Sequence, residues 1–351
     1  MKRLKYLPHF NLQWHITARC DQHCKHCYVF DSEFYASEVS NQLDSQACIR
    51  IIDDFASLRQ RWGFLGMVSF SGGDPLLRED FFEIIDYTAQ KGLTWNIMGN
   101  PYHVALDNIR FFKEKGIIDY QISLDGMEAT HDFLRRPGSF TDSINAIKLL
   151  KNNGIRVHVM FTLSKKNMGD LVDVMNLVDE LEVDLFAFDR YCSNSKNNIA
   201  NIEDVMTSEE YKLFLIRIGK EFHRLKEKGT KTVFVKKSHL WKLLAFDLGL
   251  LKAPKNSNLV FDGCSMGYRL LAILADGTVL PCRRLPIKIG KVPEQSISEI
   301  FINSEELNRI RDYGKYQKCG RCELLSVCRG CPAVAYGVVG NYYAPDPHCW
   351  R

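Results

Sequence analysis

The sequence lacks any apolar run near the length of about 18 residues that a membrane-spanning helix needs. It also lacks a strong charge of either sign, because 46 Lys and Arg against 42 Asp and Glu leave a net charge of +4. The basic start, MKRLKYLPHFNLQ, has no signal-peptide core, since Pro8, His9 and Asn11 interrupt it. We therefore expect a cytoplasmic protein with no nucleic-acid or membrane partner.

Internal repeats, low-complexity tracts and a Gly/Ser linker are also absent from the 351 residues. What is present is an alternation of short strand-like runs with longer helical patterns through about residue 190. The strand-like runs are LQWHIT (12–17), MVSFSG (67–72), LTWNIMG (93–99), YQISLDG (120–126), RVHVMFTL (156–163) and LFAFDRY (185–191). Six β-α units in series predict a parallel sheet, and they are too few for a closed eight-stranded barrel. The predicted fold class is α/β, an open partial (β/α)6 barrel.

Three regions follow from this pattern. We predict the partial barrel over residues 1–200 and a helical, basic bridging segment over 201–255, whose TSEEYKLFLIRIGKEFHRLKEKG stretch ends at Gly229. Residues 256–351 are predicted to form a small cysteine-rich α+β domain. It has short strands in LLAILADGTVLPC, one helix in SISEIFINSEELNRIRD, and seven of the twelve cysteines.

The stretch TARCDQHCKHCY places Cys20, Cys24 and Cys27 just after the first predicted strand, and no fourth cysteine follows until Cys48. The residues between them are polar, so they do not form an apolar helix stripe. Clustered cysteines in a reducing compartment indicate metal or redox chemistry. Taken alone, the triplet leaves two readings open: a zinc site completed by His23 or His26, or a metal centre with one open position.

CDQHCKHC resembles the C-x3-C-x2-C signature of radical S-adenosylmethionine (SAM) enzymes, in which three cysteines hold a [4Fe-4S] cluster and SAM binds the remaining iron. SGGDP (71–75) and SLDG (123–126) are similar to the family segments that contact the methionine end and the ribose of SAM. HDFLRRPGSF (131–140) is also typical of it. The resemblance implies that SAM or its cluster is contacted by His26, Tyr28, Gly72, Gly73, Asp74, Ser123, Asp125 and Arg135 or Arg136.

The tail resembles the SPASM extension of these enzymes, whose cysteines hold two auxiliary [4Fe-4S] clusters. By position, the outer cluster takes Cys319, Cys322, Cys328 and Cys349, and the inner cluster takes Cys264, Cys282 and Cys331. The chain departs from the family pattern in two respects. Two residues instead of three separate Cys328 from Cys331, and SMGYRLLA has no fourth ligand for the inner cluster. An open iron or a non-cysteine ligand is therefore expected there. Without the N-terminal motif, the two CxxC pairs are also compatible with a zinc module.

The resemblance implies an enzyme that cleaves SAM reductively to a 5′-deoxyadenosyl radical, with a flavodoxin or ferredoxin as electron donor. The predicted substrate is a ribosomally made peptide that acquires a thioether or carbon-carbon crosslink. Because only 19 residues precede Cys20, a separate leader-peptide-binding protein is expected as a possible partner.

Four other functions are open alternatives. In an epimerase, Cys192 would be the hydrogen donor, although ordinary packing also explains this thiol. Sulfatase maturation is disfavoured because Arg283 and Arg284 follow Cys282, where those enzymes have an Asp base. Tetrapyrrole side-chain modification and a zinc-binding regulatory protein are the remaining two.

Overall fold

The structure is a computed structural model that describes residues 8–30, 32–192, 205–253, 260 and 262–351. Within these residues ten strands form one open sheet in the order β10-β9-β8-β1-β2-β3-β4-β5-β6-β7. The strands are β1 (His9–Thr17), β2 (Leu65–Gly72), β3 (Thr94–Met98), β4 (Tyr120–Ser123), β5 (Val157–Leu163), β6 (Leu185–Arg190), β7 (Val233–Val235), β8 (Leu270–Ile273), β9 (Thr278–Leu280) and β10 (Gly290–Lys291). The six predicted strands are confirmed as β1 to β6, all parallel to their neighbours.

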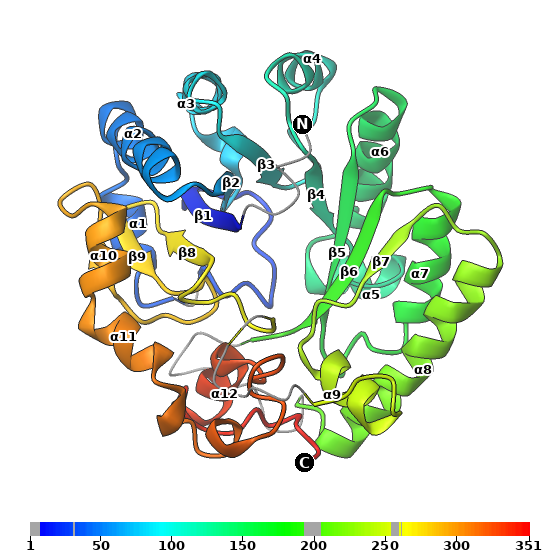
Figure 1. Ribbon diagram of the computed structural model, residues 1–351. Helices are drawn as coiled ribbons and strands as arrows, with labels where there is room; N and C mark the ends of the chain where they lie inside the picture. The colour runs from blue at the N-terminus through cyan, green and yellow to red at the C-terminus, as the bar shows by residue number, and fades with distance from the viewer. Residues whose placement is uncertain (1–7, 31, 193–204, 254–259, 261) are drawn as a thin grey trace.

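The helices follow the strands and cover the outer side of the curved sheet, as α2, α3, α4, α6, α7 and α8 show in Figure 1. They are α1 (Tyr35–Ser40), α2 (Ser45–Trp62), α3 (Phe81–Gln90), α4 (Leu106–Glu114), α5 (Glu128–Leu134), α6 (Ser139–Asn152), α7 (Leu171–Glu180), α8 (Ser208–Glu227), α9 (Leu240–Asp247), α10 (Ile297–Asn303), α11 (Glu305–Arg311) and α12 (Pro332–Val339). No helix in the described ranges is long and apolar enough to cross a membrane.

Local sequence explains where these helices begin and end. Asp44 accepts a hydrogen bond from the backbone N–H of Ala47 at the start of α2, and Gly63 ends that helix at φ 68°. Thr207 and Glu210 form a capping box at the start of α8. The predicted start of this helix and its stop before Gly229 are confirmed.

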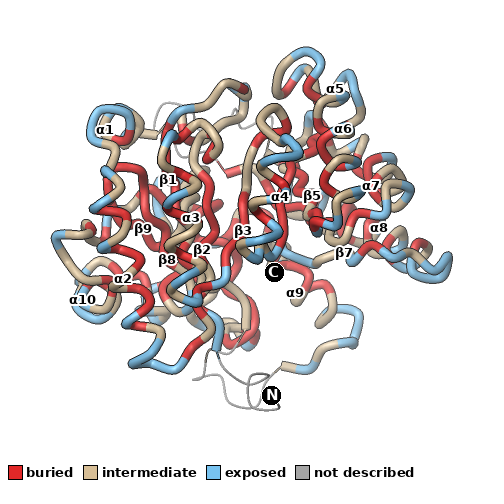
Figure 2. The backbone as a smooth tube through the Cα atoms, turned by 90° about the horizontal axis from the view of Figure 1, so that it is seen from above, coloured by how far each residue is buried: buried red, intermediate tan, exposed pale blue. Residues whose placement is uncertain are grey.

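β1 shows how the sheet separates a hydrophobic core from a polar interior. Its sequence HFNLQWHIT alternates, so that Phe10, Leu12, Trp14 and Ile16 are buried in the core between sheet and helices. The polar residues between them point to the other face, the inside of the arc. Buried residues accordingly run along the strands in Figure 2, and exposed ones lie on the outer helices. The chain thus has one face for stability and another for chemistry.

The structure departs from the sequence-based predictions in two places. The bridging segment was expected to be helical, yet its short Val233–Val235 run pairs with β6 as β7. The single helix expected over 296–312 is broken into α10 and α11 at Ser304. The Ser304 backbone is extended, and its hydroxyl accepts a hydrogen bond from the N–H of Leu307 to begin the second helix.

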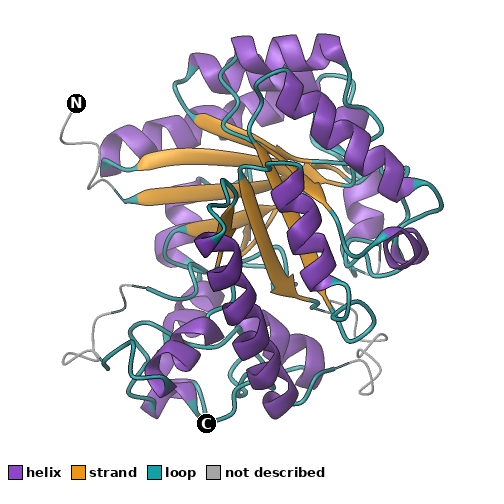
Figure 3. Ribbon diagram, turned by 90° about the vertical axis from the view of Figure 1, so that its right-hand side faces the viewer, coloured by secondary structure: helices purple, strands orange, loops and turns teal. Residues whose placement is uncertain are grey.

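The C-terminal part is joined to the barrel at both ends of the arc. On one side β8 pairs in parallel with β1 and extends the sheet. On the other side Trp350 donates a hydrogen bond to Asp247 at the end of α9, and Arg190 at the end of β6 binds Asp346. In the side view of Figure 3 the strands run through the middle of the molecule, with the C-terminal helices and loops below them.

Candidate active site

One cavity lies at the carboxyl ends of β1 to β6, the edge at which parallel α/β folds gather their functional loops. Its empty volume is about 1120 Å³ including the open mouth. The predicted site residues that line it are Cys20, Cys24, His26, Cys27 and Tyr28 after β1, Gly72 and Gly73 at the end of β2, Ser123 at the end of β4, Arg135 after α5, and Cys192 after β6. Thus residues separated by more than 170 positions in the sequence share one site.

The three cysteines after β1 are free thiols, half-buried at the cavity wall. Burial raises the pKa of Cys24 to about 11 and also raises the pKa of Cys27. The side-chain amide of Asn100 donates to Sγ of Cys20 at 3.4 Å, and Nη1 of Arg135 is 3.5 Å from Sγ of Cys24. Donors aimed at sulfur stabilise thiolates, which are the form that binds iron. The donor set therefore fits a [4Fe-4S] cluster with three protein ligands.

Asp125 organises the residues behind this triplet. Its carboxylate is fully buried, lies 2.6 Å from Nη2 of Arg135 and 3.1 Å from Nε2 of His26, and accepts the N–H of Thr162. Burial alone would raise the pKa of Asp125, but Arg135 and His26 hold it well below its usual range. The structure does not bring Asp125 to the cavity wall. The predicted ribose contact stays a prediction for it and for Ser123, which does line the cavity.

The two predicted glycines bring backbone against the end of β1. A Cβ added to Gly72, where φ is 131°, would lie 2.1 Å from the carbonyl oxygen of Thr17. At Gly73 the corresponding distance to the carbonyl oxygen of Arg19 is 2.0 Å. The Gly73 N–H donates to the Thr17 carbonyl at 2.9 Å. Only glycine fits this turn, so the backbone of the SGGDP segment forms part of the cavity wall.

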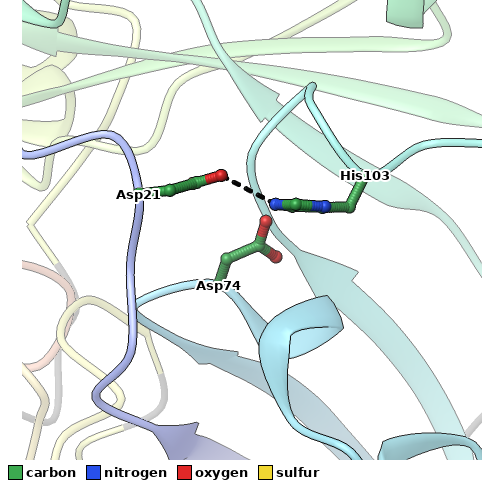
Figure 4. A group of neighbouring side chains, drawn as sticks. All are labelled: Asp21, Asp74 and His103. Atoms are coloured by element: carbon green, nitrogen blue, oxygen red, sulfur yellow. Dashed lines mark hydrogen bonds and ion pairs between the residues drawn. The ribbon is translucent and has the colours of Figure 1, made fainter.

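Asp74 lies close to Asp21 and His103, as Figure 4 shows. Oδ2 of Asp21 is 2.7 Å from Nε2 of His103, and one ligand atom from each of the three residues lies within 4.8 Å of the others. Burial raises the pKa of Asp74 to about 7. Its Oδ2 atom has no hydrogen-bond partner among the described residues. Asp74 does not line the cavity, and its predicted contact with the cofactor remains a prediction.

Arg136 also lies off the cavity. Its guanidinium donates to the carbonyl oxygen of Asp21 at 3.0 Å and stacks over the ring of Tyr102 at 3.6 Å. Of the two arginines predicted to contact SAM or its cluster, only Arg135 therefore lines the site.

The seven cysteines of the tail fall into two groups. Burial raises the pKa of Cys319 to about 12, and the neighbouring thiols of Cys328, Cys349 and Cys322 raise it further. Cys264 likewise has its pKa raised to about 12 by burial and by Cys331 and Cys282. The structure thus brings together the cysteines predicted for each auxiliary cluster. Their role as ligands stays a prediction.

Cys192 lies with the inner group and is buried. Its pKa is raised well above the usual range, first by burial and then by the charges of Cys331 and Cys282. Cys48, in contrast, is packed on α2 in the main core, as predicted for a structural thiol.

The cavity lining has more basic than acidic side chains. Five basic side chains and one acidic side chain are among the described residues that line it: Arg135, Arg190, Lys237, Arg283 and Arg284, with Asp189. Burial and the neighbouring arginines lower the pKa of Lys237 to about 8, although its side chain still reaches solvent through the cavity. Asp189 binds Arg284 at 2.8 Å. These lining residues favour an anionic ligand.

Sequence reasoning did not find Asn100, Asp189 or Lys237. Asn100 and Asp189 lie at the ends of β3 and β6, so the rule that parallel strands carry function at their carboxyl ends gave a usable signal for both. Lys237 had no such signal, because β7 itself was not predicted.

Comparison with known proteins agrees with this geometry. Residues 14–178 match the radical SAM superfamily model, and residues 264–332 match the SPASM iron-sulfur cluster-binding domain. Together the two matches cover well over half of the chain.

Three relatives align along most of the chain. It is 27% identical over 347 residues to an AdoMet-dependent heme synthase of Nitratidesulfovibrio vulgaris, covering 96% of this chain and 91% of the relative. It is 28% identical to an Fe-coproporphyrin III synthase of Methanosarcina barkeri, covering 96% and 86%. It is 25% identical to the sporulation killing factor maturation protein SkfB of Bacillus subtilis, covering 91% and 71%.

Among solved structures, SuiB of Streptococcus suis bound to precursor peptide SuiA has the same fold, with a TM-score of 0.74 at 17% identity. The match covers 98% of this chain and 76% of SuiB. The cysteine triplet at the end of β1, the open parallel sheet and the two matched domains lead to one conclusion. The chain belongs to the radical SAM superfamily, carries a C-terminal SPASM domain, and is an enzyme that uses SAM and [4Fe-4S] clusters.

Proposed function

We propose that this radical SAM enzyme modifies a side chain of a carboxylate-bearing tetrapyrrole. The observation that carries the proposal is the lining of the cavity beside Cys20, Cys24 and Cys27, with five basic side chains against one acidic among the described lining residues. Tetrapyrroles of this kind are flat, apolar rings with carboxylate arms, and guanidinium groups bind carboxylates with two parallel hydrogen bonds. Two relatives along nearly the full chain carry tetrapyrrole names.

The proposed division of labour follows the structure. When bound at the triplet, the cluster supplies the electron that cleaves SAM to methionine and a 5′-deoxyadenosyl radical. The chain's own residues hold the reactants and limit water. Gly72 and Gly73 present backbone groups at the cavity wall, and Asn100 and Arg135 donate hydrogen bonds to the ligand sulfurs. We propose that Cys20, Cys24 and Cys27 are the ligands and that a flavodoxin or ferredoxin provides the electron.

Lys237 and Arg283 are proposed to hold substrate carboxylates. Both line the cavity, and Nη1 of Arg283 lies 3.4 Å from Sδ of Met98, which places its charge at the end of β3. Three of the five basic lining side chains, Arg135, Arg190 and Arg284, also bind carboxylates of the protein.

The decisive experiment supplies the reconstituted enzyme with carboxylated porphyrins, with and without iron, under reducing anaerobic conditions. We expect 5′-deoxyadenosine formation to rise with the correct porphyrin, whose mass then changes. Lys237→Met should weaken porphyrin binding by about tenfold or more, since a charge-assisted hydrogen bond is worth roughly 1.5–3 kcal/mol. Lys220→Met, on α8, is the control that should not change it. Porphyrins that neither bind nor stimulate SAM cleavage would refute the proposal.

Peptide crosslinking is the second candidate, favoured by the match to a maturation protein for a sporulation killing factor. A peptide partner, with or without a separate leader-binding protein, belongs to this candidate alone. Co-expression with short open reading frames beside the gene, followed by mass measurement, tests it. A crosslinked peptide loses two hydrogen atoms. An epimerised peptide keeps its mass in ordinary water and gains deuterium when the reaction is run in heavy water.

A further inference from the structure

The inner group of cysteines has a fourth thiol that the motif does not contain. Cys192, Cys264, Cys282 and Cys331 pack in one hydrophobic cluster that is separate from the main core. Cys192 lies just after the end of β6, more than 70 residues before the tail motif begins. Only 5% of its surface is exposed. Family spacing therefore gives no reason to expect it there.

A network of charged groups fixes Cys192 beside Cys331. Arg190, two residues earlier, binds both carboxylate oxygens of Asp346, at 2.6 and 2.8 Å. The same carboxylate accepts the backbone N–H of Cys331 at 2.8 Å. Arg284 spans the same place, with Nη1 donating to the carbonyl of Arg190 at 3.3 Å and Nη2 lying 3.9 Å from Sγ of Cys331. The strand end and the tail cysteine are thus held as one unit.

Polar contacts do not otherwise explain a thiol at position 192. Its nearest polar partner is the carbonyl oxygen of Arg284, 3.9 Å from Sγ, which is a weak contact. All twelve cysteines are free thiols. Two buried and two half-buried thiols in one cluster are costly as thiolates unless a cation neutralises them, and an iron-sulfur cluster does this. A fourth thiol in this cluster also explains why SMGYRLLA can lack the ligand that relatives have.

We propose that Cys192 is the fourth thiolate ligand of the inner auxiliary [4Fe-4S] cluster. The cluster then has four cysteine ligands and no open iron, so it exchanges electrons but does not bind substrate. Bound to iron, Cys192 has no S–H and is not a hydrogen donor. The proposal rests on the ligand assignment proposed for Cys264, Cys282 and Cys331, and it is independent of the substrate.

The experiment uses a full-length background in which Cys20, Cys24 and Cys27 are replaced by Ala, so that only auxiliary clusters are present. We expect about eight irons per chain, from two four-iron clusters. In this background Cys192→Ala should give a [3Fe-4S] signal on mild oxidation, close to one spin per chain. Cys192→Ser should keep four irons in the inner cluster with a shifted potential, because serine oxygen can replace the sulfur. Cys48→Ala, the matched buried cysteine, should change neither spectrum nor iron content.

A second measurement needs no substitution at Cys192. Added cyanide or imidazole should leave the electron paramagnetic resonance of the auxiliary clusters unchanged, because no iron is open. A shifted signal would show an open iron and overturn the proposal, as would Cys192→Ala with eight irons and no [3Fe-4S] signal. About four irons in the background protein would overturn it together with the inner cluster, yet would leave the tetrapyrrole proposal standing.

Discussion

The loop after β1 and the inner group of the tail each contain three motif cysteines, but their surroundings differ. Around Cys20 and Cys24 the nearest side chains are the Asn100 amide and the Arg135 guanidinium, which donate hydrogen bonds to sulfur and are poor iron ligands. Cys264 and Cys331, by contrast, pack in one hydrophobic cluster with a further thiol, Cys192. This difference supports the proposal that the first group leaves one iron open for SAM and that the second group has a fourth ligand and exchanges electrons.

The largest expected effect comes from removing the three cysteines after β1. Replacing Cys20, Cys24 and Cys27 by Ala should abolish 5′-deoxyadenosine formation and lower iron by about four of twelve atoms per chain. Product analysis with dithionite and iron determination measure both. The matched triple variant at Cys264, Cys282 and Cys331 should lose four irons and still cleave SAM. Undiminished cleavage in the first variant would mean that another group holds the cluster that binds SAM.

Gly73→Ala tests whether the backbone of the SGGDP segment contributes to SAM binding. The new Cβ would meet the carbonyl oxygen of Arg19 at 2.0 Å, so the loop must move. We expect SAM affinity to fall at least about tenfold, or 1.4 kcal/mol, by equilibrium binding to reconstituted protein. Gly169→Ala, where a Cβ meets nothing within 4 Å, should bind SAM normally. Equal SAM affinities in the two variants would mean that the backbone of the SGGDP segment does not contribute to SAM binding.

Asp125→Asn tests the support behind the open site. Its loss leaves Arg135 buried without a counter-charge, which typically destabilises a protein by about 3–5 kcal/mol. The midpoint of anaerobic urea unfolding should fall accordingly. Asp107→Asn removes the exposed partner of Arg110 and should leave the midpoint unchanged. If the two variants unfold alike, the buried pair is not holding the loop.

The smallest expected effect concerns charge at the inner site. Arg284→Met removes a cation 3.9 Å from Sγ of Cys331 and should make the inner cluster harder to reduce, by roughly tens of millivolts. Redox titration followed by electron paramagnetic resonance separates the clusters. Arg284→Lys should restore most of the potential, and the cluster at Cys20 should be unaffected in both variants. An unchanged inner potential would place that cluster away from Arg284.

Sequence reasoning went furthest where chemistry depends on local spacing. C-x3-C-x2-C, the two glycines of SGGDP and the strand-like run LQWHIT each specify their structure within about ten residues. Cys192 shows the opposite case, because its neighbours are set by the pairing of Arg190 with Asp346, 156 positions apart in sequence. Pattern reasoning gave it only a general place near the strand end. Asp74 was predicted to contact the cofactor, and its side chain does not line the cavity, since a motif letter does not say which way a side chain turns; the contact stays a prediction.

The pairing of β1 with β8 has a consequence for how the protein is made. Asn11 to Trp14 pair with Leu270 to Ile273, so the partner of β1 is synthesised about 260 residues later. At the usual translation rate of 5–20 residues per second, the edge of β1 that pairs with β8 stays unpaired for on the order of tens of seconds. An uncovered strand edge is a template for pairing with other chains. Once the tail has been translated, β8 can pair with β1 and protect this strand edge from pairing with other chains.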